Sequence, residues 1–443
     1  MTVPTTPAAP SAYAGPLKVA QTEYAQRNPR SYEAWQEATL SLPGGGTRSS
    51  IFVHPFPLFI ERGEGKWVFD LDGHQYQDFV SDFTSGIYGK SNPILKDAIT
   101  RALDNGLQLG AHTKTESLLA SELCARFPSI DLVRFANSGT EANILAISIG
   151  LEYTRRKKVV VFKGGYHGSV LSHFGEDDGG DLKVPYDFLV CPYNDISGTR
   201  DAIEQHKDDI GVILVEPMLG AGGCHPGTPD FLQGLRDLAD EIGAVLIFDE
   251  VQTARLSTGG RQKILGITPD MTTLGKFFGG GFAFGAFGGK REIMSLFDAR
   301  HPQSIAHGST FNNSPLTMIA GLTAVQKILT QENLDKLNQM GDEFRENVNL
   351  HTSQNAIPFS ITGLGSINQV HFHPSTDGSQ TQSQTQMRKE GLDLFYFKLL
   401  EKGYWISQRG LISLNFEMTR EDVKAFEKAV IDSIDQVYAC RTG

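Results

Sequence analysis

Cysteines are few in this chain: there are four among 443 residues, Cys124, Cys191, Cys224 and Cys440. They are far apart and form no CxxC pair. The spacing therefore indicates neither a disulfide framework nor a cysteine-bound metal site, and we expect no metal. Widely spaced cysteines of this kind are typical of a reducing compartment, so we expect the protein to be cytoplasmic.

The sequence also lacks long apolar runs and an excess of basic residues. It has no stretch of about 18 apolar residues, so we expect no transmembrane helix. Residues 1–16 lack the basic and apolar regions of a secretory signal. Their Pro/Ala/Thr bias predicts a disordered leader over residues 1–20. A formal net charge of −11 disfavours binding to nucleic acid or to an anionic membrane.

Short apolar runs alternate with helix-length segments from about residue 90 onward. The runs lie at 132–136, 159–162, 188–191, 212–216, 244–249, 272–275 and 282–289. Apolar strands separated by helices predict an α/β fold with a largely parallel sheet covered on both faces. Ligands of such sheets bind at the carboxyl ends of the strands. Before this region, residues 57–80 predict three short strands joined by turns, which is a small antiparallel unit.

Two glycine-containing motifs follow predicted strands. The first, NSGTEA at 137–142, opens a helix, and free N–H groups at a helix N-terminus suit a phosphate. A plain N-cap with Glu141 in the first turn explains it equally well. The second, GGYHG at 164–168, would let Tyr166 lie against a flat ligand, although a simple turn is an equal alternative. We expect His167, taken alone, to be structural.

An acidic pair, Asp249 and Glu250, ends the apolar run at 244–249. A carboxylate there is costly to bury unless it is paired, and it can keep a pyridine nitrogen protonated. The alternative is a metal-binding acid beside a phosphate loop. That loop needs GxxxxGK[ST], whereas Lys276 is followed by Phe277. A dinucleotide-binding GxGxxG motif is also excluded, because no glycine run opens a helix that is followed by an acidic residue about 20 positions later.

Lys276 lies between an apolar strand and the glycine-rich segment FFGGG. Burial of this lysine would lower its pKa and make its amine a usable nucleophile and base. A single lysine is more often exposed. Asp249 precedes it by one strand–helix unit, which can bring both side chains to the same edge of the sheet.

Six motifs in this order, NSGTEA, GGYHG, VEPM, FDEV, TTLGK and HGSTF, resemble the class III aminotransferases of fold type I. The resemblance implies pyridoxal 5′-phosphate as cofactor, held by Lys276 as a Schiff base, with Lys276 also moving the proton. It implies that Asp249 pairs with the pyridine nitrogen and that Tyr166 stacks on the ring. The other implied cofactor contacts are Ser138, Gly139 and Thr140 at the phosphate, Glu216 and Val251 near the ring, and Thr310 from a second subunit.

The same resemblance implies a domain organisation and an assembly. A large cofactor-binding domain with a mostly parallel seven-stranded sheet covers 89–314. A small α+β domain is built from residues 21–88 and 315–443. The family is usually a homodimer with shared active sites.

Three segments, PGGGTR, TTLGKFFGGGFAFGAFGG and GSTFNNSPLTMIAG, resemble the glutamate-1-semialdehyde aminomutase branch of the family. Within it, ISQRGL at 406–411 resembles the β-phenylalanine aminotransferase type and differs from the aminomutase segment AFEAGF. FVHPFPL and SGIYGKSNP also resemble that type. In this type Arg48 would bind the carboxylate of a β-amino acid, and Arg409 the α-carboxylate of a keto acid. Either arginine can instead be a salt bridge between domains.

We therefore expect a ping-pong aminotransferase that moves an amino group from a β-amino acid, or a related amine, to 2-oxoglutarate or pyruvate. An aminomutase is one alternative, and a cofactor-binding protein without turnover is another. Two departures from the family pattern, Gln252 and Lys90, leave their effects open.

Overall fold

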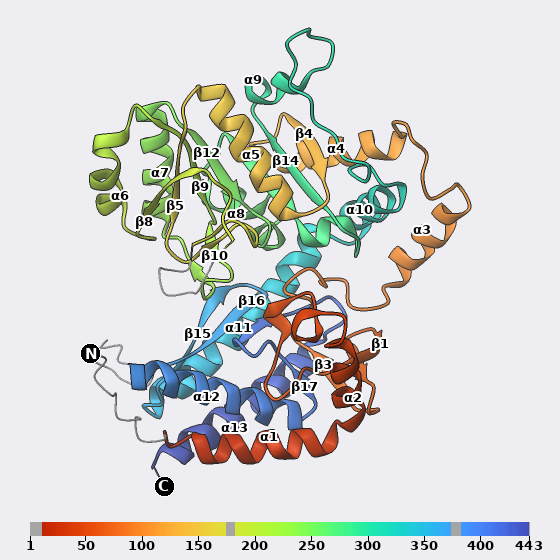
Figure 1. Cartoon of the computed structure of the whole chain (residues 1–443), viewed down its shortest axis with the longest axis vertical. Helices are drawn as coiled ribbons and strands as arrows, with labels where there is room; N and C mark the ends of the chain where they lie inside the picture. The colour runs from red at the N-terminus through yellow and green to blue at the C-terminus, as the bar shows by residue number, and fades with distance from the viewer. Residues whose placement is uncertain (1–10, 174–181, 374–381, 443) are drawn as a thin grey trace. The chain divides into compact units, whose positions relative to one another are not determined.

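The computed structural model describes residues 11–173, 182–373 and 382–442 (Figure 1). The chain divides into two compact units. Unit 1 consists of Met1–Phe83, Gly89–Ser91 and Gln339–Gly443, and unit 2 of Thr84–Tyr88 and Asn92–Asn338. Among the described residues, no helix combines the length and the apolarity that crossing a membrane requires.

The core of unit 2 is a seven-stranded sheet in the order β4-β14-β13-β12-β9-β5-β8. Every predicted apolar run is one of its strands: β4 (Leu132–Ala136), β5 (Lys158–Phe162), β8 (Asp187–Cys191), β9 (Ile210–Val215), β12 (Val245–Asp249), β13 (Met271–Gly275) and β14 (Gly285–Gly289). Only β14 runs antiparallel to its neighbours in this sheet. The predicted α/β fold with a mostly parallel sheet is therefore confirmed.

Alternate residues of these strands enter two separate apolar clusters, one on each face. Val159 and Val161 pack with residues of α5 (Gly139–Thr154), whereas Val160 and Phe162 pack with residues of α7 (Pro229–Ile242). Both faces being covered explains why the strands lack polar alternation in the sequence.

The other elements of unit 2 surround this sheet. They are α3 (Pro93–Leu103), α4 (Lys114–Arg126), β6 (Gly165–Tyr166), β7 (Ser172–His173), α6 (Ile196–Ile203), η3 (Glu204–His206), β10 (Met218–Leu219), β11 (His225–Pro226), η4 (Thr253–Leu256), α8 (Gly260–Leu265), η5 (Lys276–Gly279), α9 (Arg291–Met294), η6 (Ser295–Phe297) and α10 (Pro315–Lys327). The helix α10 packs on α3 and α4. The unit boundary therefore falls within α11 (Gln331–Gln354), later than the predicted boundary at 314.

Unit 1 holds two small sheets and the terminal helices. Its first sheet has the order β1-β2-β3-β17 and contains the predicted antiparallel unit, and its second has the order β15-β16-β18. Its elements are α1 (Ala14–Arg27), α2 (Pro29–Ala38), η1 (Pro43–Gly45), η2 (Ser49–Ile51), β1 (Ile60–Glu64), β2 (Trp67–Asp70), β3 (Gln75–Asp78), β15 (Phe359–Leu364), β16 (Ile367–Phe372), α12 (Gln382–Glu401), β17 (Tyr404–Trp405), β18 (Leu411–Ser413) and α13 (Arg420–Thr442).

The predicted leader over residues 1–20 is wrong in its last part, because α1 begins at Ala14. Leu17, Ala20 and Tyr24 are buried, and α1 packs on α12. Composition could not reveal this, since the stabilising partner lies at the other end of the chain. Residues 1–10 lie outside the described residues.

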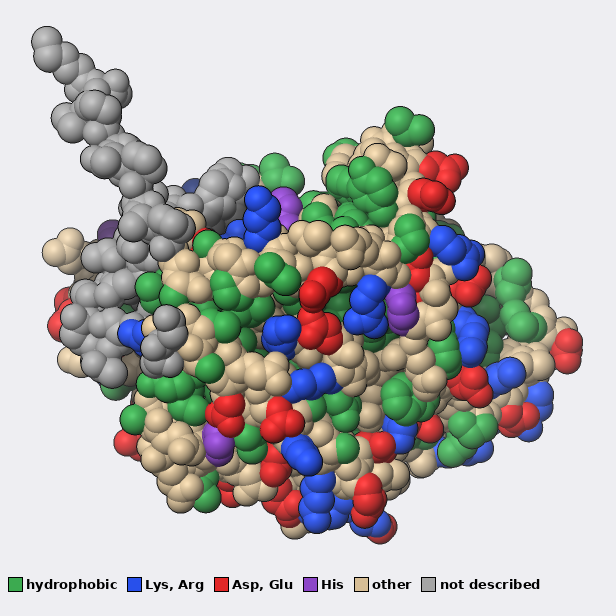
Figure 2. Space-filling view, turned by 90° about the horizontal axis from the view of Figure 1, so that it is seen from below, with side chains coloured by type: hydrophobic (Ala, Val, Ile, Leu, Met, Phe, Trp, Pro, Cys, Tyr) green, Lys and Arg blue, Asp and Glu red, His purple; other side chains and the backbone are tan. Residues whose placement is uncertain are grey.

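On the face that Figure 2 presents, acidic and basic side chains are interspersed with apolar ones rather than gathered by sign.

Four successive residues that follow β3 adopt the left-handed backbone conformation. Their φ angles are 44° at Ser81, 46° at Asp82, 52° at Phe83 and 79° at Thr84. A left-handed residue other than glycine costs roughly 1–2 kcal/mol, and such residues normally occur singly. The surrounding contacts must therefore impose this turn, and a backbone held under strain is often associated with function.

Candidate active site at the carboxyl edge of the large sheet

Asp249 and Lys276 lie at the carboxyl ends of neighbouring parallel strands. Asp249 is the last residue of β12, and its register partner on β13 is Thr273. Lys276 follows the end of β13 directly, with a φ of 54°. Both residues therefore lie at the same edge of the sheet, as their spacing in the sequence predicted.

The carboxylate of Asp249 is buried and held from three sides. Its Oδ1 accepts a hydrogen bond from the backbone N–H of Val251 at 3.0 Å. Its Oδ2 accepts one from Nδ2 of Asn143 at 2.8 Å and lies 2.8 Å from Nδ1 of His167. Asn143 also donates to the carbonyl of His167 and accepts from the hydroxyl of Thr273. This network fixes the orientation of a charge that would otherwise be costly to bury.

Lys276, for which the sequence left both burial and exposure open, is partly buried. Its Nζ donates to Oγ1 of Thr84 at 3.1 Å. The carbonyl of Thr84 accepts from Nη1 of Arg255, which is fully buried, and burial lowers the pKa of that guanidinium to about 9. The hydroxyl of Tyr88 donates to the carbonyl of Phe277 at 2.5 Å. Residues 84–88 thus brace the lysine and the turn after it.

The N-terminus of α5 meets the ends of β12 and β13 at close range. Ser138 caps the helix, with its Oγ accepting from the N–H of Glu141 at 3.1 Å. A methyl group on Gly275 would lie 3.2 Å from Val251 and 3.4 Å from the backbone of Gly139. The first N–H groups of α5 have no acceptor within their helix. Such N–H groups suit an anion, and they lie at the edge of the sheet that carries Asp249 and Lys276.

Tyr166 ends β6, shortly after β5, and Glu216 directly follows β9. Tyr166 is 41% exposed. Glu216 is buried and accepts hydrogen bonds from the N–H groups of Tyr166 and Gly220, both at 2.9 Å. Burial, reinforced by the nearby charge of Asp249, raises the pKa of Glu216 to about 7.

Glu216→Gln is expected to gain thermal stability over the wild type as the pH rises. Glu216 keeps its proton in the fold up to about pH 7 but loses it near pH 4.5 when unfolded, so the wild type loses stability across that interval. The contribution is on the order of 3 kcal/mol. Melting temperatures from pH 5 to pH 8 should show the difference between variant and wild type growing. A difference that stays constant, as expected for the exposed Glu64→Gln, would contradict this.

Three further residues named from the sequence have different surroundings. Thr310 is exposed in this chain. Gln252 packs on Gly220, and its Oε1 is buried without a hydrogen-bond partner among the described residues. Lys90, the other departure from the family pattern, belongs to unit 1, where its Nζ pairs with the buried Asp78 at 2.5 Å. Lys90 therefore neutralises a buried acid.

Arg48 and Arg409 both belong to unit 1, where their guanidiniums lie over the same ring. Their Cζ atoms are 5.2 Å and 5.6 Å from the centroid of Phe83. Arg48 also pairs through Nη1 with Asp82 at 2.7 Å. A cavity of about 830 Å³ opens beside Arg48, with a wall that is mainly apolar and includes Phe52, Leu58 and Trp405.

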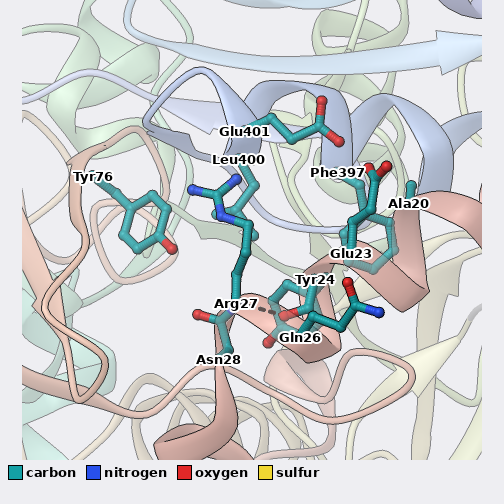
Figure 3. A pocket seen from close by; sticks show the side chains of 10 residues that line it. All are labelled: Ala20, Glu23, Tyr24, Gln26, Arg27, Asn28, Tyr76, Phe397, Leu400 and Glu401. Atoms are coloured by element: carbon teal, nitrogen blue, oxygen red, sulfur yellow. Dashed lines mark hydrogen bonds between the residues drawn. The ribbon is translucent and has the colours of Figure 1, made fainter.

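A second hollow of unit 1, of about 480 Å³, lies among α1, β3 and α12 (Figure 3). Tyr24, Tyr76 and Glu401 are among the side chains that line it. The hydroxyl of Tyr24 donates to the carbonyl of Phe56, and that of Tyr76 to Asp70. No lysine lines it, so it offers no amine for covalent chemistry.

Three residues support the site, and two of them, Asn143 and Thr84, were not named from the sequence. Asn143 is a polar residue inside the apolar helix run EANILAISIG, which is a signal that could have identified it. His167 was named and expected to be structural, and it contacts Asp249. Thr84 gives no signal in the sequence, because its contact with Lys276 spans 192 positions.

Comparison with known proteins gives consistent likenesses. The family model of aminotransferase class-III matches residues 49–419. A beta-phenylalanine transaminase of Variovorax paradoxus is 43% identical over 416 residues, which are 94% of this chain and 94% of that protein. The solved structure of a beta-phenylalanine aminotransferase from the same organism has a TM-score of 0.91 at 41% identity and covers 96% of this chain and 98% of that one.

Two other solved structures cover most of this chain. A transaminase with PLP bound has a TM-score of 0.86 at 29% identity, covering 94% of this chain and 99% of that one. A glutamate-1-semialdehyde aminomutase from Pseudomonas aeruginosa has a TM-score of 0.85 at 22% identity, covering 96% and 98%. The last likeness concerns the fold alone.

Proposed function

This chain belongs to the class III aminotransferase family, and from that premise we propose that it moves an amino group from a β-amino acid to a 2-keto acid such as 2-oxoglutarate or pyruvate. The observation that carries the proposal is the pairing of two guanidiniums over Phe83 beside a large apolar cavity. Enzymes of this family depend on pyridoxal phosphate, so the residues of this chain must fit that cofactor.

The residues at the carboxyl edge of unit 2 do fit it. The junction of Gly139 and Gly275 leaves little room for a Cβ and brings free N–H groups of α5 to the edge, as a phosphate requires. The orphaned Oε1 of Gln252 would be satisfied by a polar group of the cofactor. Lys276 would hold the aldehyde and Asp249 the pyridine nitrogen. The remaining contacts are Ser138, Thr140, Glu216, Val251 and the exposed face of Tyr166.

Pyridoxal phosphate, when bound, supplies an aldehyde that condenses with amines and a ring that withdraws electrons from the reacting carbon. The chain supplies the acid–base chemistry. The carboxylate of Asp249, fixed by Asn143 and His167, keeps a proton on the ring nitrogen. Nζ of Lys276 takes the proton from the amine-bearing carbon of the donor. Between proton transfers, Nζ of Lys276 donates a hydrogen bond to the hydroxyl of Thr84, which holds the amine in place.

The substrate class rests on Arg48, Arg409 and the cavity. A transaminase accepts two acids in turn, and their carboxylates stand at different distances from the reacting carbon. Two arginines, each able to bind a carboxylate through two N–H groups, serve both acids. The cavity beside Arg48 has a volume typical of small-molecule sites and an apolar wall suited to an aromatic side chain. The 43% identical beta-phenylalanine transaminase supports the same choice.

Arg48→Ala is expected to raise the KM for β-phenylalanine roughly 10- to 100-fold, because a charge-assisted carboxylate contact is lost. The KM for 2-oxoglutarate should change little, and Arg409→Ala should give the reverse pattern. Steady-state kinetics with each substrate varied in turn measure both. The control is Arg62→Ala, because Arg62 also stacks on a phenylalanine and pairs with an acid, Phe69 and Glu64.

Three outcomes would contradict the proposed function. Equal effects of both arginine variants on both substrates would mean that neither is a dedicated carboxylate site. Sustained turnover with one amino donor and no keto acid would instead favour the aminomutase. A wild type that holds the cofactor but reacts with no amine would favour the non-catalytic alternative.

We also propose that the protein is a homodimer with shared active sites, in which Thr310 completes the phosphate site of the partner. The exposure of Thr310 in the single chain supports this. Nearby, Nδ2 of Asn137 donates to Oγ of Ser309 at 3.3 Å and to Oδ1 of Asn312 at 3.0 Å, which ties the segment of Thr310 to the N-terminus of α5.

A further inference from the structure

The left-handed turn after β3 is held by buried contacts at its beginning. Oδ1 of Asp78 accepts from the N–H groups of Val80 and Ser81 at 2.8 Å and 2.9 Å. The hydroxyl of Ser81 donates to the carbonyl of Ser413 and accepts from Nδ2 of Asn415. Asp78 and Ser81 are both fully buried. The beginning of the turn is therefore a fixed part of unit 1, although none of the four left-handed residues is glycine.

The next two residues of the turn, Asp82 and Phe83, both contact Arg48. Asp82 pairs with Nη1 of Arg48 at 2.7 Å, and the ring of Phe83 lies under the guanidinium. The two side chains of the pair are 48% and 54% exposed. An ion pair so open to water adds little to stability. The strained turn consequently gains little folding energy from this ion pair, so the contact between Asp82 and Arg48 calls for another explanation.

The geometry of the pair leaves most of the guanidinium available. Asp82 uses a single nitrogen, Nη1, whereas a carboxylate substrate is best bound through two parallel N–H groups. Phe83 restricts the guanidinium from below. An arginine held in this way has lost part of its rotational freedom before a substrate arrives, so less is lost on binding.

We propose that Asp82 is a positioning residue for recognition of the amino donor. It holds Nη1 of Arg48 so that the other edge of the guanidinium meets the donor's carboxylate, and the left-handed turn exists to aim Asp82 and Phe83 at Arg48. This inference rests on the proposed function, since it takes Arg48 as the donor's carboxylate site. It also gives the strained turn a role in specificity.

The test compares two amino donors on the holoenzyme. β-Phenylalanine carries a carboxylate, and 1-phenylethylamine has the same ring and amine-bearing carbon without one. Asp82→Ala is expected to raise the KM for β-phenylalanine about two- to fivefold, the cost of ordering one long side chain that an exposed ion pair can offset, with little change in kcat. The KM for 1-phenylethylamine should stay within about twofold of the wild type.

Two more variants of Asp82 separate position from charge and from backbone strain. Asp82→Asn keeps an acceptor for Nη1 and should restore most of the wild-type KM. Asp82→Gly relieves the left-handed backbone yet removes the carboxylate, so it should match Asp82→Ala. Glu64→Ala is the matched control, because Glu64 pairs with Nη1 of the phenylalanine-stacked Arg62 at 3.2 Å. It should leave both donors unaffected.

Three results would overturn the inference. A fall in KM for β-phenylalanine in Asp82→Ala would make Asp82 a competitor of the substrate. Equal effects on both donors would indicate a merely structural role. An unchanged KM would show that Arg48 needs no positioning. If Arg48→Ala also left the KM for β-phenylalanine unchanged, the proposed function would fail instead, so the two failures are distinguishable.

Discussion

Lys276→Ala is expected to lower kcat by a factor of about 10³ or more while leaving the protein folded. The substitution removes both the amine that holds the cofactor and the base that moves the proton, and general base catalysis alone contributes about 10²- to 10⁴-fold. Folding should survive because the side chain of Lys276 is only partly buried. Kinetics with β-phenylalanine and 2-oxoglutarate provide the measurement.

A second readout and a matched lysine make this test specific. Borohydride treatment followed by intact mass spectrometry should show cofactor fixed to the wild type and absent from Lys276→Ala. Lys163→Ala is the control, because Lys163 also directly follows a strand, β5, at the same edge of the sheet but is exposed. Small primary amines in solution should restore part of the activity of Lys276→Ala. Unchanged turnover in that variant, or fixation at another residue, would refute the role.

The strands of unit 2 were predictable because they are buried on both faces. Val159, Val160 and Val161 point alternately to two different apolar clusters, so all three of these positions are apolar. A continuous apolar run between helices is a strong signal of a parallel sheet. The same topology places the ends of β12 and β13 side by side, which is why Asp249 and Lys276 could be brought together from the sequence.

The supporting network was less accessible, because it depends on which helix covers which strand. Asn143 reaches Asp249 across 106 positions, a pairing that the spacing of residues in the sequence does not specify. Thr84 contacts Lys276 from a left-handed turn that contains no glycine, so the sequence gives no signal of that turn. Similarly, α1 is stabilised by α12, so the local composition of residues 14–20 pointed to disorder. Long-range partners decide each of these cases.

Asp249→Asn is expected to lower kcat on the order of 100-fold or more, with a smaller change in the KM of either substrate. The negative charge that keeps the ring nitrogen protonated is lost, and fixed charges of this kind contribute about 10²- to 10³-fold. Stability should fall as well. Asn143, Val251 and His167 all direct N–H donors at this carboxylate, and an amide nitrogen would face one of them.

Glu250→Gln separates the loss of activity from the loss of stability. Glu250 is the next residue, is fully buried, and accepts from the hydroxyl of Thr253 and from the N–H groups of Arg261 and Gln262. Its substitution should lower the melting temperature yet leave kcat per bound cofactor near the wild-type value. A cofactor methylated at the ring nitrogen carries a permanent charge there, so it should restore part of the activity of Asp249→Asn. The prediction would be wrong if the methylated cofactor restored no activity to Asp249→Asn while Asp249→Asn and Glu250→Gln lost stability equally. Asp249 would then act only by stabilising the fold, and not by holding a charge at the ring nitrogen.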